Sequence, residues 1–223
     1  MPSMSRPNNG AQRHLLVVNP NTNPAVTALI RRTIAEAATP GICATVVGAE
    51  RGPFSIETDA QRADAVPGLL DVIEPLRSNN YDGYIIACFD DIGVAETRAM
   101  VSKPVLDLSE AGMTAARQFG PFAIITTVAA AIPRIEALAG RYGVAGQCRV
   151  YAAEIGVAEA AAQTELAWSR LTALTDTAKQ EHGARAILLG SGGFAGMARP
   201  LGERSAIAVI DGVVAAVEAM ADQ

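Results

Sequence analysis

Two reactive side chains, Cys88 and Ser191, each follow a short apolar run and precede a polar or glycine-rich loop. A thiolate can act as a base or a nucleophile near neutral pH, because the unperturbed pKa of a cysteine is about 8.5. A serine hydroxyl needs an adjacent base before it can do the same. The alternative for Cys88 is the role of a small buried hydrophobic residue, which is what most lone cysteines have.

Polar residues end two further apolar runs. Asn19 ends the first of them, and Thr126 and Thr127 follow a later one. Such side chains can hold a carbonyl or carboxylate group of a ligand, or they can serve only as helix caps and turn formers. Both interpretations stay open for the threonines, whereas Asn19 is expected at the ligand site and Asn23 at a helix start.

Glycines surround Ser191 in the sequence. Gly192 and Gly193 would let backbone amides come close to a ligand. The segment has neither the glycine spacing nor the lysine of a nucleotide-binding loop. Leu189 stands where the first glycine of a serine-hydrolase elbow belongs, and the chain has two histidines with which to complete a triad. A serine hydrolase is therefore not expected.

The elements that must position these residues are those of an α/β protein. Short runs rich in Val, Ile and Leu alternate with longer Ala-rich segments of helical periodicity, which is typical of buried parallel strands covered by helices. The predicted strands are 14–18, 42–47, 83–87, 104–106, 122–125, 149–152, 185–189 and 207–210. One long helix is expected over about 158–181, with Trp168 in a packing role.

The second half of the chain repeats the first. Three segments match in the same order, at offsets of 107, 103 and 104 residues: Leu15-Leu-Val-Val-Asn19 with Phe122-Ala-Ile-Ile-Thr-Thr127, Gly83-Tyr-Ile-Ile-Ala-Cys88 with Ala186-Ile-Leu-Leu-Gly-Ser191, and Val105-Leu-Asp107 with Val209-Ile-Asp211. A duplicated βα unit predicts two similar lobes. Asp107 and Asp211, at equivalent strand ends, are expected to cap helices.

We expect the first lobe to comprise 13–110 plus 206–223, the second to comprise 111–205, and 1–12 to be a disordered leader. Ligands of parallel sheets bind beyond the carboxyl ends of the strands, so Cys88 and Ser191 are expected to face each other across one shared cleft. Each is also expected at a helix start, where free amides and the helix dipole would lower the pKa of the Cys88 thiol.

Composition narrows the function classes. The 223 residues carry a formal charge of −5 and 50% hydrophobic side chains, which argues against a nucleic-acid or anionic-membrane surface. The longest apolar stretch has eleven residues, far fewer than a membrane span needs. Three cysteines without a CxxC pair and two histidines predict neither a disulfide framework nor a metal site. A cytoplasmic protein that binds a small molecule or copies of itself is expected.

The chain resembles the hydantoin and allantoin racemases of the aspartate/glutamate racemase superfamily over about residues 15–220. The resemblance rests on Val18-Asn-Pro-Asn-Thr22, Gly52-Pro-Phe-Ser-Ile-Glu57, Ala65-Val-Pro-Gly-Leu-Leu70, Ile86-Ala-Cys-Phe-Asp-Asp91, Ile125-Thr-Thr127 and Val209-Ile-Asp-Gly212. It implies two pseudo-twofold lobes, no cofactor, a homo-oligomer, and two cysteines that remove and return the C5 proton of a hydantoin on opposite faces.

Cys88 matches the first-lobe cysteine of this family, and Ser191 stands where the family has its second. The resemblance also implies a set of substrate-binding residues: Asn19, Ser55, Ile56, Phe89, Asp90, Thr126, Thr127, Gly192 and Gly193. Because Ser191 has no histidine or lysine in its motif to activate it, two-base racemisation is in doubt.

We interpret the chain as a racemase variant inactivated by a Cys-to-Ser change, because a one-atom change keeps the shape of the cleft. A natural member of the family that uses one base is the alternative. Three more functions stay open: a single-cysteine decarboxylase of the same superfamily, a cis–trans isomerase of that superfamily, and a binding protein that retains the cleft without turnover.

Overall fold

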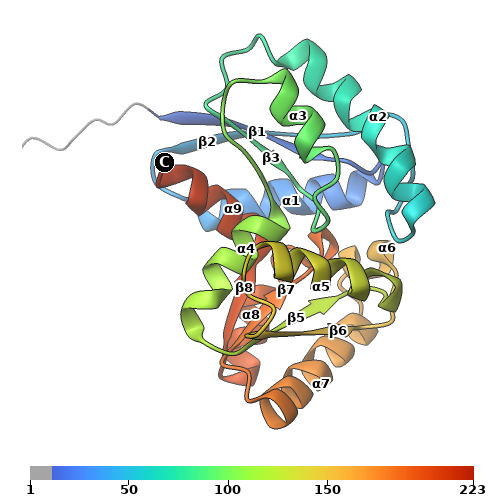
Figure 1. Ribbon diagram of the computed structural model, residues 1–223, viewed down its shortest axis with the longest axis vertical. Helices are drawn as coiled ribbons and strands as arrows, with labels where there is room; N and C mark the ends of the chain where they lie inside the picture. Colours follow the sequence, from blue (N-terminus) through green and yellow to red (C-terminus); the bar gives the residue numbers. More distant parts are fainter. Residues whose placement is uncertain (1–11) are drawn as a thin grey trace, which may run out of the picture.

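Two parallel four-stranded sheets form the framework of the computed structural model, which describes residues 12–223. The first sheet has the order β2-β1-β3-β4 and the second the order β6-β5-β7-β8. The strands are β1 (Arg13–Asn19), β2 (Ile42–Gly48), β3 (Gly83–Ile86), β4 (Val105–Asp107), β5 (Phe122–Thr126), β6 (Cys148–Ala152), β7 (Ala186–Leu189) and β8 (Ala208–Asp211). The predicted α/β class and the two similar lobes are confirmed, and Figure 1 shows one lobe above the other.

Helices cover both sheets. They are α1 (Pro24–Ala37), α2 (Asp59–Leu76), α3 (Val94–Met100), α4 (Leu108–Ala116), α5 (Ile132–Arg141), α6 (Val157–Ala161), α7 (Glu165–His182), α8 (Ala198–Ser205) and α9 (Gly212–Ala221), with short 3-10 turns at Arg117–Phe119, Ala129–Ala131 and Gly192–Phe194. None of the helices in residues 12–223 is both long and apolar enough to cross a bilayer.

Side-chain caps start several helices where the sequence predicts them. The Asn23 side chain accepts the amide of Ala25 ahead of α1, with Pro24 in the first turn. Asp107 and Asp211 cap α4 and α9. The single helix expected over 158–181 is wrong: Gln163 adopts a φ of 51° between α6 and α7, and Thr164 then caps α7.

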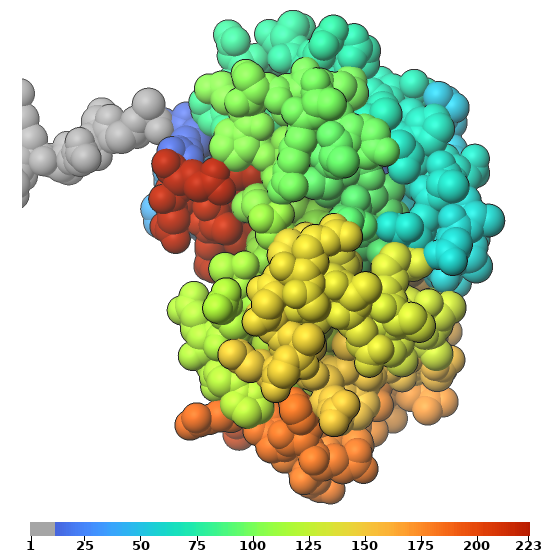
Figure 2. Space-filling model, in the orientation of Figure 1, coloured from blue at the N-terminus to red at the C-terminus, as the bar shows by residue number. Residues whose placement is uncertain are grey.

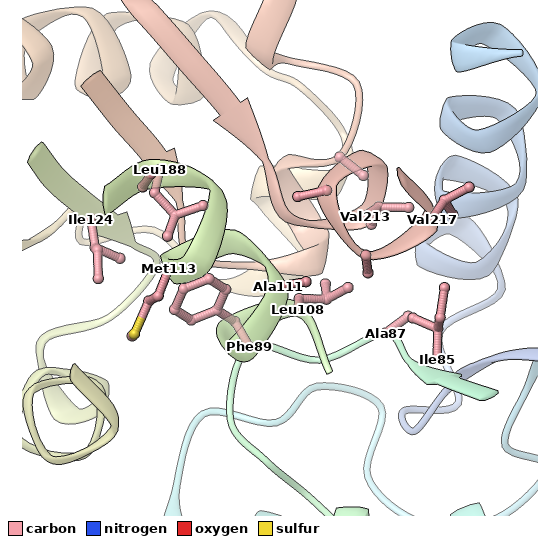
Figure 3. Close-up of a cluster of buried hydrophobic side chains, with 14 of the residues drawn as sticks. Ile85, Ala87, Phe89, Leu108, Ala111, Met113, Ile124, Leu188, Val213 and Val217 are labelled. Atoms are coloured by element: carbon pink, nitrogen blue, oxygen red, sulfur yellow. The ribbon is translucent and has the colours of Figure 1, made fainter. Parts of the chain in front are cut away.

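One hydrophobic cluster extends through both lobes, and each lobe has a further cluster of its own. The central strands β3, β5 and β7 are buried along their whole length, as continuous apolar runs in a parallel sheet predict. The largest cluster of buried side chains joins Ile85 of β3 and Leu188 of β7 through Leu108 and Met113 of α4 and Val213 of α9. Figure 3 shows these side chains together, and Figure 2 shows segments of the two lobes in direct contact on the face drawn.

Helices α4 and α9 are exchanged between the lobes. Helix α4 follows β4 of the first sheet but packs on β7 and β8, where Gly112 lies so close to Leu188 that a Cβ would come within 2.7 Å of its Cδ1. Helix α9 follows β8 but packs on α1 and β3, where Met220 fills the space beside Gly83. Figure 1 shows α9 beside α1 in the upper lobe.

This exchange corrects the expected lobe boundary. Strand β8 pairs with β7 from Ala208 to Asp211, so it belongs to the second sheet, and only α9 returns to the first lobe. The expected leader at 1–12 lies, apart from Gln12, outside the described residues. Cys43 is exposed on the edge strand β2, whereas Cys148 is buried.

Candidate functional site

Strand register places Cys88 and Ser191 at equivalent points of the two lobes. Val18 of β1 pairs with Ile86 of β3, and Cys88 follows two residues after Ile86. Ile125 of β5 pairs with Leu189 of β7, and Ser191 follows two residues after Leu189. The chain therefore carries a thiol and a hydroxyl at matching carboxyl ends of its two central strand pairs.

Both side chains line one cavity between the lobes. The expected site residues Ile56, Phe89, Asp90, Thr126, Thr127, Gly192 and Gly193 line it as well, together with Asn21, Val26, Glu57, Ala87, Val128, Ala131, Arg134, Ile135, Val157 and Gly190. The expected site residues Asn19 and Ser55 are not among the lining residues. A thiol from one lobe and a hydroxyl from the other thus face a common space.

Asn19 does not line the cavity but hydrogen-bonds to a residue that does. Its side chain is fully buried and donates to the side-chain oxygens of Asn21 at 2.9 Å and Thr27 at 3.0 Å. The Asn21 side chain in turn accepts the amide of Asn23 at 3.0 Å, and Asn21 lines the cavity. Asn19 therefore holds Asn21, and it is Asn21, a residue not predicted at the site, that reaches the cavity.

The environment of the Cys88 thiol is opposite to the one expected. Burial raises the pKa of Cys88 well above its ordinary value, and the carboxylates of Asp90 and Asp107 raise it further, against Arg62 and the amide of Phe89. No helix starts at Cys88, because a loop separates it from α3, which begins at Val94. The predicted lowering of this pKa by a helix terminus is therefore wrong.

Ser191 has no activating partner among the residues that line the cavity. The Gly193 amide donates to its Oγ at 3.1 Å, and none of the lining residues is a histidine or lysine. The glycines that follow are needed for close packing, since a Cβ at Gly192 would lie 3.1 Å from the carbonyl oxygen of Ala87 and one at Gly193 would lie 2.9 Å from that of Val157. The hydroxyl is thus positioned at the cavity but not activated as a base.

Charged side chains join the two lobes beside Cys88. Asp90 accepts from Arg62 at 2.7 Å and from Arg134, which stands on α5 of the second lobe and also pairs with Asp59. Burial raises the pKa of Asp90 against the opposing effect of these two arginines. Asp90 is therefore held as the centre of an ion-pair network, and its carboxylate is occupied by protein donors.

A second bridge comes from the Ser-Ile-Glu loop. Glu57 accepts the amide of Val157 from the other lobe at 2.9 Å, and Ile56 beside it lines the cavity. The amide of Thr22 donates to the carbonyl of Pro53 at 3.0 Å, which ties this loop to the one that carries Asn21. Phe54, which could have folded onto the core, is 58% exposed.

Three lining residues with polar or charged side chains were missed from the sequence: Asn21, Glu57 and Arg134. Asn21 and Glu57 lie in two of the segments on which the family resemblance rests. The polar residues at alternate positions of these loops were the signal that could have identified them. Arg134 gave none, because its partner Asp90 is 44 residues away and belongs to the other lobe.

Comparison with known proteins places this site in a family context. The family model described as Asp/Glu/Hydantoin racemase matches residues 15–220. A hydantoin racemase from Rhizobium meliloti is 34% identical over 210 residues, which cover 92% of this chain and 86% of that protein.

Solved structures agree with this match. An allantoin racemase from Klebsiella pneumoniae superposes with a TM-score of 0.90 at 32% identity, covering 94% of this chain and 86% of that one. An allantoin racemase from Pseudomonas fluorescens gives a TM-score of 0.88 at 27% identity, covering 94% and 89%.

Proposed function

The chain belongs to the Asp/Glu/hydantoin racemase family, and we propose that it transfers a proton at C5 of a 5-substituted hydantoin, with allantoin among the candidate substrates. The observation that carries the proposal is the placement of Cys88 and Ser191 at equivalent strand ends on one cavity. The named relatives act as support, since they are hydantoin and allantoin racemases.

The first step is removal of the C5 proton by the Cys88 thiolate. The C5–H bond is adjacent to a carbonyl, so the electron pair passes into an enolate. Hydroxyl and amide groups of Thr126, Thr127 and Gly192 line the cavity and are the candidates for holding the enolate oxygen.

The second step decides the outcome. If the Cys88 thiol returns the proton, the substrate keeps its configuration and only exchanges its hydrogen with solvent. Inversion requires a donor on the opposite face, and Ser191, which lines the cavity from the other lobe, is the candidate. A hydroxyl is a far weaker acid than a thiol, so we propose fast exchange in one enantiomer and slow inversion.

The test follows each enantiomer of allantoin and of 5-benzylhydantoin in D2O, by optical rotation and by deuterium uptake at C5. We expect the chain to exchange one enantiomer faster than it inverts either, and the Ser191→Cys variant to invert both. A protein that binds these compounds without exchanging the C5 hydrogen would be a binding member of the family. Turnover of a malonate or a maleate in their place would favour a decarboxylase or an isomerase.

Self-association is a further part of the proposal, and it follows from the family resemblance alone. Light scattering on the purified chain measures it directly. A monomer at micromolar concentration would contradict it.

A further inference from the structure

Two buried carboxylates, Asp107 and Asp211, lie behind the cavity at equivalent positions. Asp107 is 1% exposed and Asp211 is 6% exposed, and neither lines the cavity. Asp107 pairs in register with Ile86, two residues before Cys88, and Asp211 pairs with Leu189, two residues before Ser191. Each aspartate therefore stands beside the strand end that carries one of the two candidate proton-transfer groups.

Asp107 divides its two oxygens between a helix and a loop. Oδ1 accepts the amide of Glu110 at 2.8 Å, which caps α4, and Oδ2 accepts the amide of Asp91 at 2.7 Å in the loop that follows Cys88. The Ser109 hydroxyl donates to both oxygens at 2.9 Å. The carboxylate thus binds more donors than a helix cap requires.

The loop after Cys88 contains a residue whose backbone conformation has to be stabilised by neighbouring groups. Asp91 adopts a φ of 40°, in the left-handed region that a residue with a side chain seldom occupies without support. The amide of Leu108, next to Asp107, also donates to the carbonyl of Cys88 at 3.2 Å. Residues 107 and 108 therefore fasten the loop at its start and at its strained turn.

Asp211 repeats this arrangement in the other lobe. Oδ1 accepts the amide of Val213 at 2.9 Å, which caps α9, and Oδ2 accepts the amide of Gly196 at 2.6 Å, at the end of the loop that starts with Ser191. Gly196 has a φ of 78°, so here too the bound amide belongs to a left-handed residue. The same oxygen plays the same part in both lobes.

We infer that Asp107 and Asp211 are a matched pair of positioning residues, each of which holds the loop of one proton-transfer group and thereby serves one face of the substrate. The inference rests on the proposed function. A cap of α4 or α9 uses one carboxylate oxygen, whereas the second oxygen in each lobe binds the loop. Since a misplacement of about 1 Å can cost a factor of about 100 in rate, such a hold affects proton transfer directly.

The test uses two single-base proteins that differ in which lobe carries the cysteine. The chain as it stands has its thiol at position 88, and the reciprocal variant Cys88→Ser/Ser191→Cys has it at position 191. In each protein we place Asp107→Ser or Asp211→Ser, because serine still caps a helix but is too short and has too few oxygens to hold the loop as well. Asp107→Asn and Asp211→Asn replace them if a serine variant fails to fold.

The readout is initial deuterium uptake at C5 for each enantiomer. We expect Asp107→Ser to slow uptake about tenfold or more in the chain as it stands and less than about twofold in the reciprocal variant, because displacement of the loop outweighs the loss of a carboxylate that raises the pKa of Cys88. Asp211→Ser should show the reverse. Thr164→Ala is the matched control, since Thr164 caps α7 without binding a cavity loop, and it should change neither rate.

Two failures are distinguishable. If neither single-base parent takes up deuterium, the proposed function is wrong. If both parents do, but each aspartate variant slows both proteins equally or slows neither, the proposed function stands and the positioning role is overturned.

Discussion

The two lobes share a framework and differ in the loop that each presents to the cavity. In the first lobe the loop after β3 carries a thiol beside Asp90 and is tied by Arg62. In the second lobe the loop after β7 carries a hydroxyl between glycines and packs by close backbone contact. The strand order and register are the same in both, so the asymmetry of the site lies in its chemistry and not in its architecture.

The contrast between the loops motivates the proposed division of the two-base reaction between the lobes. A thiol is intrinsically a stronger acid than an unassisted hydroxyl, so Cys88 is the better candidate for proton transfer even though its pKa is raised. On the proposed mechanism, the first lobe carries the proton-transfer group and the second lobe carries a hydroxyl at the equivalent position. Three substitutions and a pH profile test this division between the lobes.

Loss of the Cys88 thiol should have the greatest consequence. Cys88→Ala removes the proposed base, and C5 deuterium uptake should fall by at least about 1000-fold, since Cys88 is the one thiol among the residues that line the cavity. Cys43→Ala is the matched control because Cys43 is exposed on β2 and does not line the cavity. Unchanged exchange in Cys88→Ala would remove the thiol from the mechanism.

We expect a substitution at Ser191 in the second lobe to increase the rate of inversion. Ser191→Cys restores a thiol on the second lobe, and inversion of both enantiomers should rise about 100-fold, which is within the usual range for one acid–base group. Polarimetry measures it directly. Ser55→Cys, which adds a thiol outside the cavity lining, should leave inversion unchanged; equal gains in both variants would point to nonspecific thiol catalysis.

The pH dependence of exchange should report the ionisation of the Cys88 thiol. The protein raises the pKa of Cys88, and the base is active only after losing its proton. Exchange should therefore rise by about tenfold per pH unit through neutral pH and level off only in alkaline solution. The rate of exchange is corrected for the rate in buffer alone. If this rate stops rising below pH 7, the thiol is already ionised there, which would contradict the prediction.

A smaller loss of activity is expected when the ion pairs between the two lobes are removed. Arg134→Ala removes the contacts of α5 with Asp90 and Asp59, which should loosen the cavity and lower kcat/KM for exchange about fivefold through KM. Arg32→Ala, which breaks an exposed pair with Glu36 within α1, serves as the control. Equal kinetics in the two variants would show that the bridge does not matter to binding.

Much of the framework could be predicted because it depends on local patterns. Apolar runs marked all eight strands of the described residues, and the internal repeat paired β3 with β7 and so Cys88 with Ser191. The caps at Asn23, Asp107 and Asp211 followed from residue type and place. These features need only neighbours in sequence.

Features that depend on contacts between distant segments were predicted wrongly or not at all. The exchange of α9 was anticipated, but not that β8 stays with the second sheet. The expected helix start at Cys88 led to the wrong direction for its pKa, since the carboxylates that act on it come from Asp90 and from Asp107 on the next strand. Ser55, expected at the cavity by resemblance, does not line it.

The order of the residues is enough to specify the two-lobe α/β framework, the pairing of Cys88 with Ser191, and the resemblance to hydantoin racemases. Periodicity and repeats suffice for these, because burial on both faces of a parallel strand is written into the order of its residues. The protonation of the thiol and the bridges at Arg134 and Glu57 emerge only from packing of the two lobes. Electrostatic environment depends on which distant charges meet at one point and on how far water is excluded from it, and both exist only once the lobes have packed.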